Sequence, residues 1–257
     1  MDISELAQLA QEAWFRGLAA GGFAQVSVGG GFAVSTGLDS NTENGAVVTP
    51  SVLRSPHELD VLLDWLREKA VPASVLVTGP PDPEATARLI DRGLVPERTG
   101  NNMGRVLTGA ENLPASQWQI SEVLDVPALR ENQRVYADDG WWDEPGGLDD
   151  QVEVAARLGF GPGRPIRHWT ARHQGVAVGA ATSFQFGDAV LLVHCCVAAP
   201  WRRRGIGAAL TRVRLAAAAG RGAVQAVLFP SPDGYQLHHS LGFELAPVRP
   251  DRCFYLY

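Results

Sequence analysis

Three successive arginines and two glycines lie between an apolar run and an alanine-rich stretch in VAAPWRRRGIGAALTRV, residues 197–213. The run before them, AVLLVHCCV, is typical of a buried strand, and the residues after Gly207 favour a helix. The first turn of a helix carries unpaired backbone N–H groups at the positive end of its dipole. Gly205 and Gly207 let an anion approach this backbone, and the arginines add charged donors. The segment predicts a phosphate or pyrophosphate site, with a solvated surface turn as the alternative.

The segment differs from two widespread phosphate-binding patterns. A Walker loop requires GxxxxGK[ST], and the only lysine of the chain is Lys69. GIGAAL also lacks the third glycine of the dinucleotide-binding fingerprint. The predicted anion site therefore belongs to neither class.

Two motifs resemble those of the GNAT acetyltransferases. The pattern V-x-x-P-x-R-x-x-G-x-G of that family's acyl-CoA loop is matched by Val197, Pro200, Arg202, Gly205 and Gly207. A second segment, SPDGYQLHHSLGFE at residues 231–244, is similar to the closing motif N-x-x-A-x-x-L-Y-x-x-L-G-F. The resemblance covers roughly residues 118–257 and implies that acetyl-CoA (coenzyme A) is the cofactor.

The resemblance also implies where the cofactor binds. The strand before the loop is expected to splay from its neighbour, so that its backbone pairs with the pantetheine arm. The loop itself is expected to hold the pyrophosphate. The cofactor-binding residues expected on this basis are Cys195, Val197, Arg202, Arg203, Arg204, Gly205, Ile206, Gly207, Ala208 and Ser231.

The family's usual general acid is a tyrosine, and His238 occupies that position in this sequence. A histidine can donate a proton near neutral pH, so His238 is a candidate acid. Tyr235, three residues earlier on the same helical face, is a second candidate. A helical histidine without a catalytic role is the alternative for His238.

The general base is harder to place, because alignment to the loop arginine puts Leu191 where some family members carry a glutamate. His194 is the nearest titratable side chain and is the candidate base. On a regular strand it points away from Cys195 and Val197, unless a bulge intervenes. Cys195 and the adjacent Cys196 suggest a thiol nucleophile, but buried structural thiols are the simpler interpretation.

The acceptor side has one compositional clue. DDGWWDEPGGLDD, residues 138–150, carries six carboxylates and two tryptophans and no basic residue. Acidic and aromatic side chains suit a cationic amine, so Asp139, Trp141 and Trp142 are candidate acceptor-binding residues. A solvated acidic loop is the alternative.

The elements that must position these residues occur twice along the chain. Each half has a helix, three β-like runs, a further helix, a strand, a second helix and a last strand. The first half is expected to end with the strand MGRVL and the second with CFYLY. We therefore expect an α/β (α+β) fold of two GNAT-like mixed-sheet domains in tandem, with the C-terminal one complete. The expected domains are residues 1–110 and 119–257, joined by a linker at 111–118.

The first half lacks the anion loop. At the corresponding place, after GAVVT, it reads PSVLRSPHEL, in which Ser55 caps a helix, Pro56 begins it and Glu58 completes a capping box. A second helix is expected after the cap Asp82. One active site per chain follows, and the first half is expected to brace the second.

Composition excludes several classes of protein. The net charge of −6 argues against nucleic-acid binding, and no apolar run is long enough to span a membrane. The acidic, amphipathic first residues are unlike a signal sequence, so a cytoplasmic location is expected. Three cysteines without a CxxC spacing predict neither a disulfide framework nor a metal site. A monomer or homodimer is expected.

Together these observations favour an N-acetyltransferase that moves an acetyl group directly from acetyl-CoA to a primary amine of a small molecule. An amino-sugar antibiotic, an amino acid or a polyamine would qualify. Acetylation of a protein or peptide amine is one alternative. A non-catalytic CoA-binding sensor is another, because the family's tyrosine and glutamate are both absent.

Overall fold

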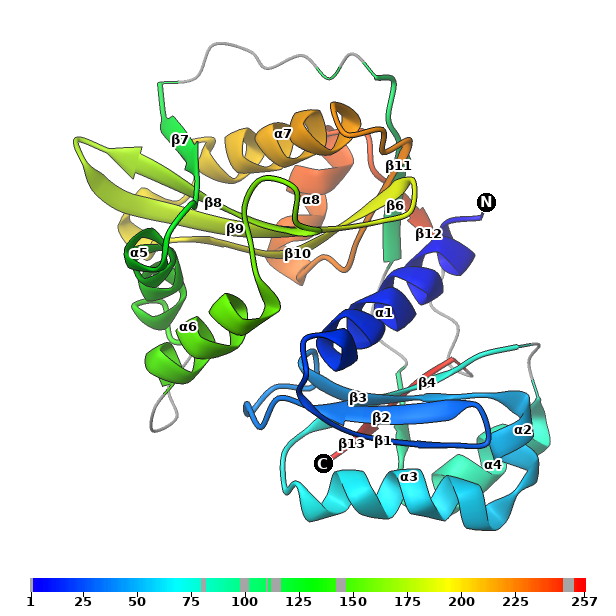
Figure 1. Ribbon diagram of the computed structural model, residues 1–257. Helices are drawn as coiled ribbons and strands as arrows, with labels where there is room; N and C mark the ends of the chain where they lie inside the picture. The colour runs from blue at the N-terminus through cyan, green and yellow to red at the C-terminus, as the bar shows by residue number, and fades with distance from the viewer. Residues whose placement is uncertain are drawn as a thin grey trace. The chain divides into compact units, whose positions relative to one another are not determined.

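The computed structural model describes residues 2–79, 82–97, 102–109, 111, 117–141, 147–246 and 252–257. The chain divides into two compact units. Unit 1 contains residues 1–10 and 101–246, and unit 2 contains residues 11–100 and 247–257. Each unit has its own mixed sheet, as the sequence predicts (Figure 1).

Unit 1 contains the predicted anion loop. Its helices are α5 (Val126–Ala137), α6 (Gly147–Leu158), α7 (Ile206–Ala219) and α8 (Pro232–Ser240), with a 3₁₀ turn at Ala199–Trp201. Its strands are β6 (Asn102–Val106), β7 (Gln119–Glu122), β8 (Ile166–His173), β9 (Val176–Phe186), β10 (Ala189–Val197), β11 (Gln225–Leu228) and β12 (Glu244–Ala246). The sheet order is β12-β6-β11-β10-β9-β8-β7, with α7 over one face and α5 and α6 over the other (Figure 1).

The neighbouring strands β10 and β11 are parallel but pair over a short distance only. Residues 189–192 of β10 face residues 225–228 of β11, and β11 then ends. Within the described part of the chain, no strand pairs with residues 193–197 on that side of β10. This half of the strand therefore keeps an open backbone edge next to the loop that leads into α7.

A register break lies in the same half of β10. Leu192 faces Ser183 on β9, and Cys195 faces Ala181, so two residues of β10 lie opposite the single residue Thr182. This is a β-bulge, and it changes which side chains share a face. Leu192 and Cys195 both pack on the side of α7, although regular alternation over three residues would separate them.

Helix α7 approaches the sheet closely because β9 has a glycine beneath it. A Cβ on Gly179 would lie 2.8 Å from Cγ2 of Ile206 and 3.1 Å from Cδ1 of Leu210. Both of those α7 side chains are fully buried. Gly179 therefore sets how near the start of α7 lies to β10.

Unit 2 has a six-stranded sheet in the order β1-β2-β3-β4-β13-β5. Its strands are β1 (Ala24–Val28), β2 (Gly31–Ser35), β3 (Asn44–Val48), β4 (Ala73–Val77), β5 (Val95–Pro96) and β13 (Cys253–Leu256). Its helices are most of α1 (Ile3–Ala20), then α2 (Pro50–Arg54), α3 (Pro56–Glu68) and α4 (Pro83–Asp91). Ser55 and Asp82 cap α3 and α4 through their side chains, as expected from their positions.

The division into two consecutive domains was wrong in two strands. β6, expected to finish the first half, pairs with β11 and β12 in unit 1. β13, expected to close the second half, pairs with β4 and β5 in unit 2. Local residue pattern identifies a strand but carries little information about its partner, so the exchange was not visible in the sequence. Of the expected linker, residues 112–116 lie outside the described residues.

Candidate functional site

The loop between β10 and α7 leaves the N-terminus of α7 without a side-chain cap. Gly205 is the N-cap, with a φ of 85°, and it offers no side chain to the first-turn amides. Five other helices accept such a bond on a side-chain oxygen of Thr49, Ser55, Asp82, Asp125 or Ser231. The amides of the first turn of α7 are therefore available to an external acceptor, and the dipole favours an anion there.

Two of the three loop arginines project into solvent beside this helix end. Arg203 and Arg204 are both exposed, and the Arg204 guanidinium lies over the Trp201 ring, 4.9 Å from its centroid. Arg203 has a φ of 63°, in the left-handed region that side chains other than glycine seldom adopt. This strained backbone turns the loop toward the start of α7, and the two cations add to the field at the helix end.

Arg202 has a different role from its neighbours. Its Nε donates to the carbonyl of Val197 at 3.0 Å, and its guanidinium forms an ion pair with Asp139. Cys196 Sγ lies 3.4 Å from the same Asp139 carboxylate. Arg202 thus holds the cofactor loop against β10 and against the segment that follows α5. Arg202, expected to bind the cofactor, and Asp139, expected to bind the acceptor, therefore contact each other in this structure.

The other expected cofactor residues contribute through backbone or packing. The Ile206 side chain is buried against the sheet, so only its amide faces the loop. Ala208 packs against the core on the α7 side. The Ser231 hydroxyl caps α8 by accepting from the Gly234 amide at 3.2 Å. Gly207 lies at the contact between α7 and α8, where an added Cβ would be 3.1 Å from Leu237 Cδ2.

The bulge places His194 beside the acceptor candidates. His194 contacts the rings of Tyr136 and Trp141, with centroid separations of 6.1 and 5.9 Å. Tyr136 lies on α5, and Trp141 belongs to the segment that follows it. As expected for a strand, His194 faces away from Cys195 and Val197, which pack on the side of α7. Trp142 lies outside the described residues.

The two adjacent thiols are poor nucleophiles. Burial raises the pKa of Cys195, and burial together with the Asp139 carboxylate raises the pKa of Cys196 well above its usual value. A raised pKa leaves little thiolate at neutral pH. These surroundings fit buried structural thiols better than a thiol nucleophile.

His238 is buried on α8, against the Phe243 ring at a centroid separation of 5.7 Å. Burial, together with the positive charge of Arg214, lowers its pKa to about 4. The resting imidazole is therefore neutral at pH 7, which argues against the expected role as an imidazolium acid. Tyr235, on the same helix, is half-buried and stacks on His239 at 6.0 Å.

Sequence reasoning missed Arg214, which lies at the centre of this site. Its side chain is fully buried and bonds to two carbonyls of the sheet. A signal existed, because Arg214 falls between Leu210 and Ala218 on the buried stripe of α7. A charged residue on such a stripe marks a polar contact inside the core.

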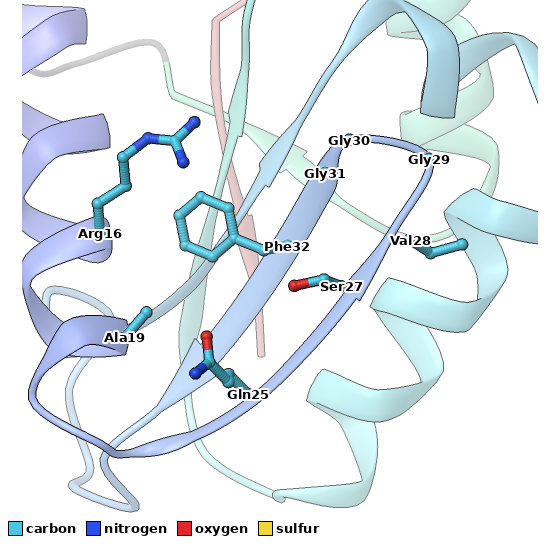
Figure 2. Close-up of a pocket in the computed structure, with 9 residues that line it drawn as sticks. All are labelled: Arg16, Ala19, Gln25, Ser27, Val28, Gly29, Gly30, Gly31 and Phe32. Carbon is cyan, nitrogen blue, oxygen red and sulfur yellow. The ribbon is translucent and has the colours of Figure 1, made fainter.

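A cavity of about 540 Å³ lies elsewhere, in unit 2 between α1 and the β1–β2 hairpin. Figure 2 shows Arg16 and Phe32 at one wall and Gln25 and Ser27 at another. Arg16 lies 5.0 Å from the Phe32 centroid and pairs with Glu12, so its charge is already engaged. None of the residues expected to bind a ligand lines this cavity.

Comparison with known proteins identifies the fold. Residues 132–243 match the Acetyltransferase (GNAT) family, a range that includes the anion loop, His194 and α8. The domain that these residues form belongs to the GNAT acetyltransferases. The family match and the fold support acetyl transfer as the activity of this domain, and GNAT enzymes use acetyl-CoA.

Solved structures extend the likeness to the whole chain. A GCN5-related N-acetyltransferase from Kribbella flavida is 20% identical with a TM-score of 0.65, covering 99% of this chain and 95% of its own. A tandem GNAT protein from the clavulanic acid biosynthesis pathway is 15% identical with a TM-score of 0.60, covering 98% and 93%. These identities show the fold, which is that of tandem GNAT proteins. No curated protein matches the chain.

Two kinds of feature are absent from the described ranges of the chain. No helix there is both long and apolar enough to cross a membrane. No cluster of three or more His, Cys, Asp or Glu side chains there could hold a metal ion.

We predict that Arg203→Gly stabilises the protein. Glycine adopts a positive φ without the steric cost of a Cβ, so the free energy of unfolding should rise by up to about 1 kcal/mol in urea denaturation. Arg204→Gly is the matched control, because Arg204 is not among the residues with a positive φ. It should lower stability, since glycine there only adds freedom to the unfolded chain. Equal effects of the two changes would contradict the strain at Arg203.

We also predict that His238 weakens the fold in acid. Between pH 6.5 and pH 4 the unfolded chain binds a proton at this residue and the folded chain does not, so stability falls as the pH falls. His238→Gln should reduce the slope of unfolding free energy against pH in this window by up to about 1.4 kcal/mol per pH unit. His239→Gln, at the exposed neighbouring position, is the control. Equal slopes in the two variants would show that His238 keeps an ordinary pKa.

Proposed function

We propose that this GNAT protein transfers an acetyl group from acetyl-CoA directly to a primary amine of a small molecule, at a single site in unit 1. The observation that carries the proposal is the uncapped N-terminus of α7 next to the bulge of β10. An anion site lies on one side of that bulge, and an imidazole with an aromatic wall lies on the other.

The structure contains features that fit acetyl-CoA. Free first-turn amides of α7 and the exposed Arg203 and Arg204 suit the pyrophosphate. The open edge of β10 at residues 193–197 suits the amide groups of the pantetheine arm, which can bond to a strand edge as a further strand would. When bound, acetyl-CoA supplies the activated thioester.

His194 is the residue that we assign as general base. A protonated amine must lose a proton before it can attack, and His194 is a titratable side chain beside the acceptor wall. Trp141, which is 42% exposed, offers the face of an aromatic ring to the amine. Asp139 adds a carboxylate next to the same strand, although Arg202 shares its charge.

Of the two candidate acids that the sequence offers for the leaving thiolate, we favour Tyr235 over His238. Because His238 is neutral at rest, Tyr235 is the remaining side chain of the pair that the sequence named. We assign the acid role to Tyr235. Its phenol lies on α8, the helix that packs beside α7.

A small-molecule acceptor fits the site better than a peptide. The acceptor wall consists of a few side chains, Asp139, Trp141 and His194, gathered over one short stretch of β10. Recognition of a peptide amine usually uses an extended backbone-binding edge as well. Incubation with acetyl-CoA and either small amines or N-terminal peptides, with CoA release as the readout, distinguishes the two.

One acetyl-CoA should bind per chain. The corresponding place in unit 2 is occupied by α2 and α3, whose first-turn amides are capped by Thr49 and Ser55. Titration calorimetry should therefore give a stoichiometry of one. Two sites per chain would contradict the assignment of unit 2 as a support without cofactor.

His194→Asn should lower kcat by about one hundredfold or more, the usual scale of general base catalysis, with little change in the affinity for acetyl-CoA. Tyr235→Phe should lower kcat as well, whereas His238→Ala should not. His239→Asn is the control for removal of an imidazole. Full activity of His194→Asn, with turnover lost only in His238→Ala, would contradict the assignment of His194 as the base and of Tyr235 as the acid.

A further inference from the structure

Arg214 is a buried cation without a carboxylate partner among the described residues. It is 1% exposed, and no ion pair of the described chain includes it. Its Nε is buried with no hydrogen-bond partner in that part of the chain. Burying a guanidinium costs several kcal/mol unless its donors are well matched. The contacts of its other two nitrogens therefore show what the residue does.

The Nη1 atom of Arg214 bonds to both strands at the bulge. It donates to the carbonyl of Thr182 on β9 and to the carbonyl of His194 on β10, each at 3.0 Å. These residues lie where the register between β9 and β10 is broken. A bulge leaves backbone groups without ladder partners, and an unpaired buried carbonyl is costly. Arg214 supplies the donors that the interrupted ladder lacks.

The Nη2 atom connects the same guanidinium to the cofactor loop. It donates to the Thr211 hydroxyl at 3.2 Å, and that hydroxyl donates to the carbonyl of Gly207 at 2.9 Å. A continuous chain of hydrogen bonds thus runs from the first turn of α7 to the backbone of His194. Such networks hold buried groups in one arrangement when each member is paired.

We propose that Arg214 is a positioning residue for acetyl transfer, which closes the β10 bulge and thereby holds His194 against Trp141 and Tyr136. The inference rests on the proposed role of His194 as base. Without Arg214, the carbonyls of Thr182 and His194 lose these two hydrogen bonds. The two strands then relax toward a regular register, which would turn the residues after Leu192 to the opposite faces.

Substitution of Arg214 tests this proposal. Arg214→Met keeps the length and burial of the side chain while removing its donors to the two carbonyls. We expect kcat to fall by about tenfold or more, while KM for acetyl-CoA changes by less than about threefold, because Thr211 still holds Gly207. Arg214→Lys can bond to the two carbonyls but cannot also reach Thr211. Its kcat should lie between those of the parent protein and Arg214→Met. Arg212→Met, on the same helix, should match the parent.

A double-mutant cycle separates positioning from general loss of structure. If Arg214 acts through His194, Arg214→Met should change kcat by less than about twofold in a His194→Asn background. An undiminished effect in that background would overturn the proposal, as would wild-type kcat in folded Arg214→Met. If Arg214→Met fails to fold, Thr211→Val takes its place in the cycle, because it removes only the hydroxyl that orients the guanidinium.

The imidazole NMR signals of His194 provide a readout that does not depend on turnover. They should shift in Arg214→Met and stay in place in Arg212→Met; unchanged signals in both would overturn the positioning role. Full activity of His194→Asn contradicts the proposed base but leaves this measurement valid. Loss of activity in His194→Asn together with unchanged signals and kcat in Arg214→Met contradicts only the role of Arg214.

Discussion

The extra residue in β10 opposite Thr182 is the constraint on which the rest of the site depends. It interrupts the regular ladder with β9 just beyond the point where β11 ends on the other side, and pairing with β9 resumes at Cys195. Because the ladder is interrupted, Leu192 and Cys195 share the α7 face while His194 reaches Tyr136 and Trp141 on the other. The bulge thus gives the imidazole its aromatic contact, while the early end of β11 leaves the open strand edge beside it.

Positive charge is concentrated on the α7 side of this bulge. The uncapped end of α7 and the exposed Arg203 and Arg204 lie at the surface, and Arg214 lies in the core beneath them. The surface charges attract an anion and are screened by salt, whereas the buried charge is not. Arg214 also contributes, after burial, to lowering the pKa of His238 to about 4. The same field therefore disfavours a protonated His238.

Each unit takes one strand from outside its own half of the sequence, yet the two units are not equivalent. β6 completes the sheet of unit 1, and β13 completes that of unit 2. In unit 2 the places that correspond to the loop and α7 hold two side-chain-capped helices, which satisfy their own amides. The difference between an anion site and a structural helix thus depends on a few residues at the helix start.

The sequence by itself determined the elements and the anion loop, since helix caps, glycines and apolar periodicity act within a few residues. Local pattern of this kind predicted the helix caps Ser55 and Asp82, the helix after Gly205 and the uncapped loop before it. Only the tertiary structure decided the features that depend on partners far along the chain. These are the bulge that orients His194, the burial that keeps His238 neutral, the Arg202–Asp139 pair and the exchange of β6 and β13. Arg214 lies between the two cases, because its place on a buried stripe was visible but its carbonyl partners, 20 and 32 residues away, were not.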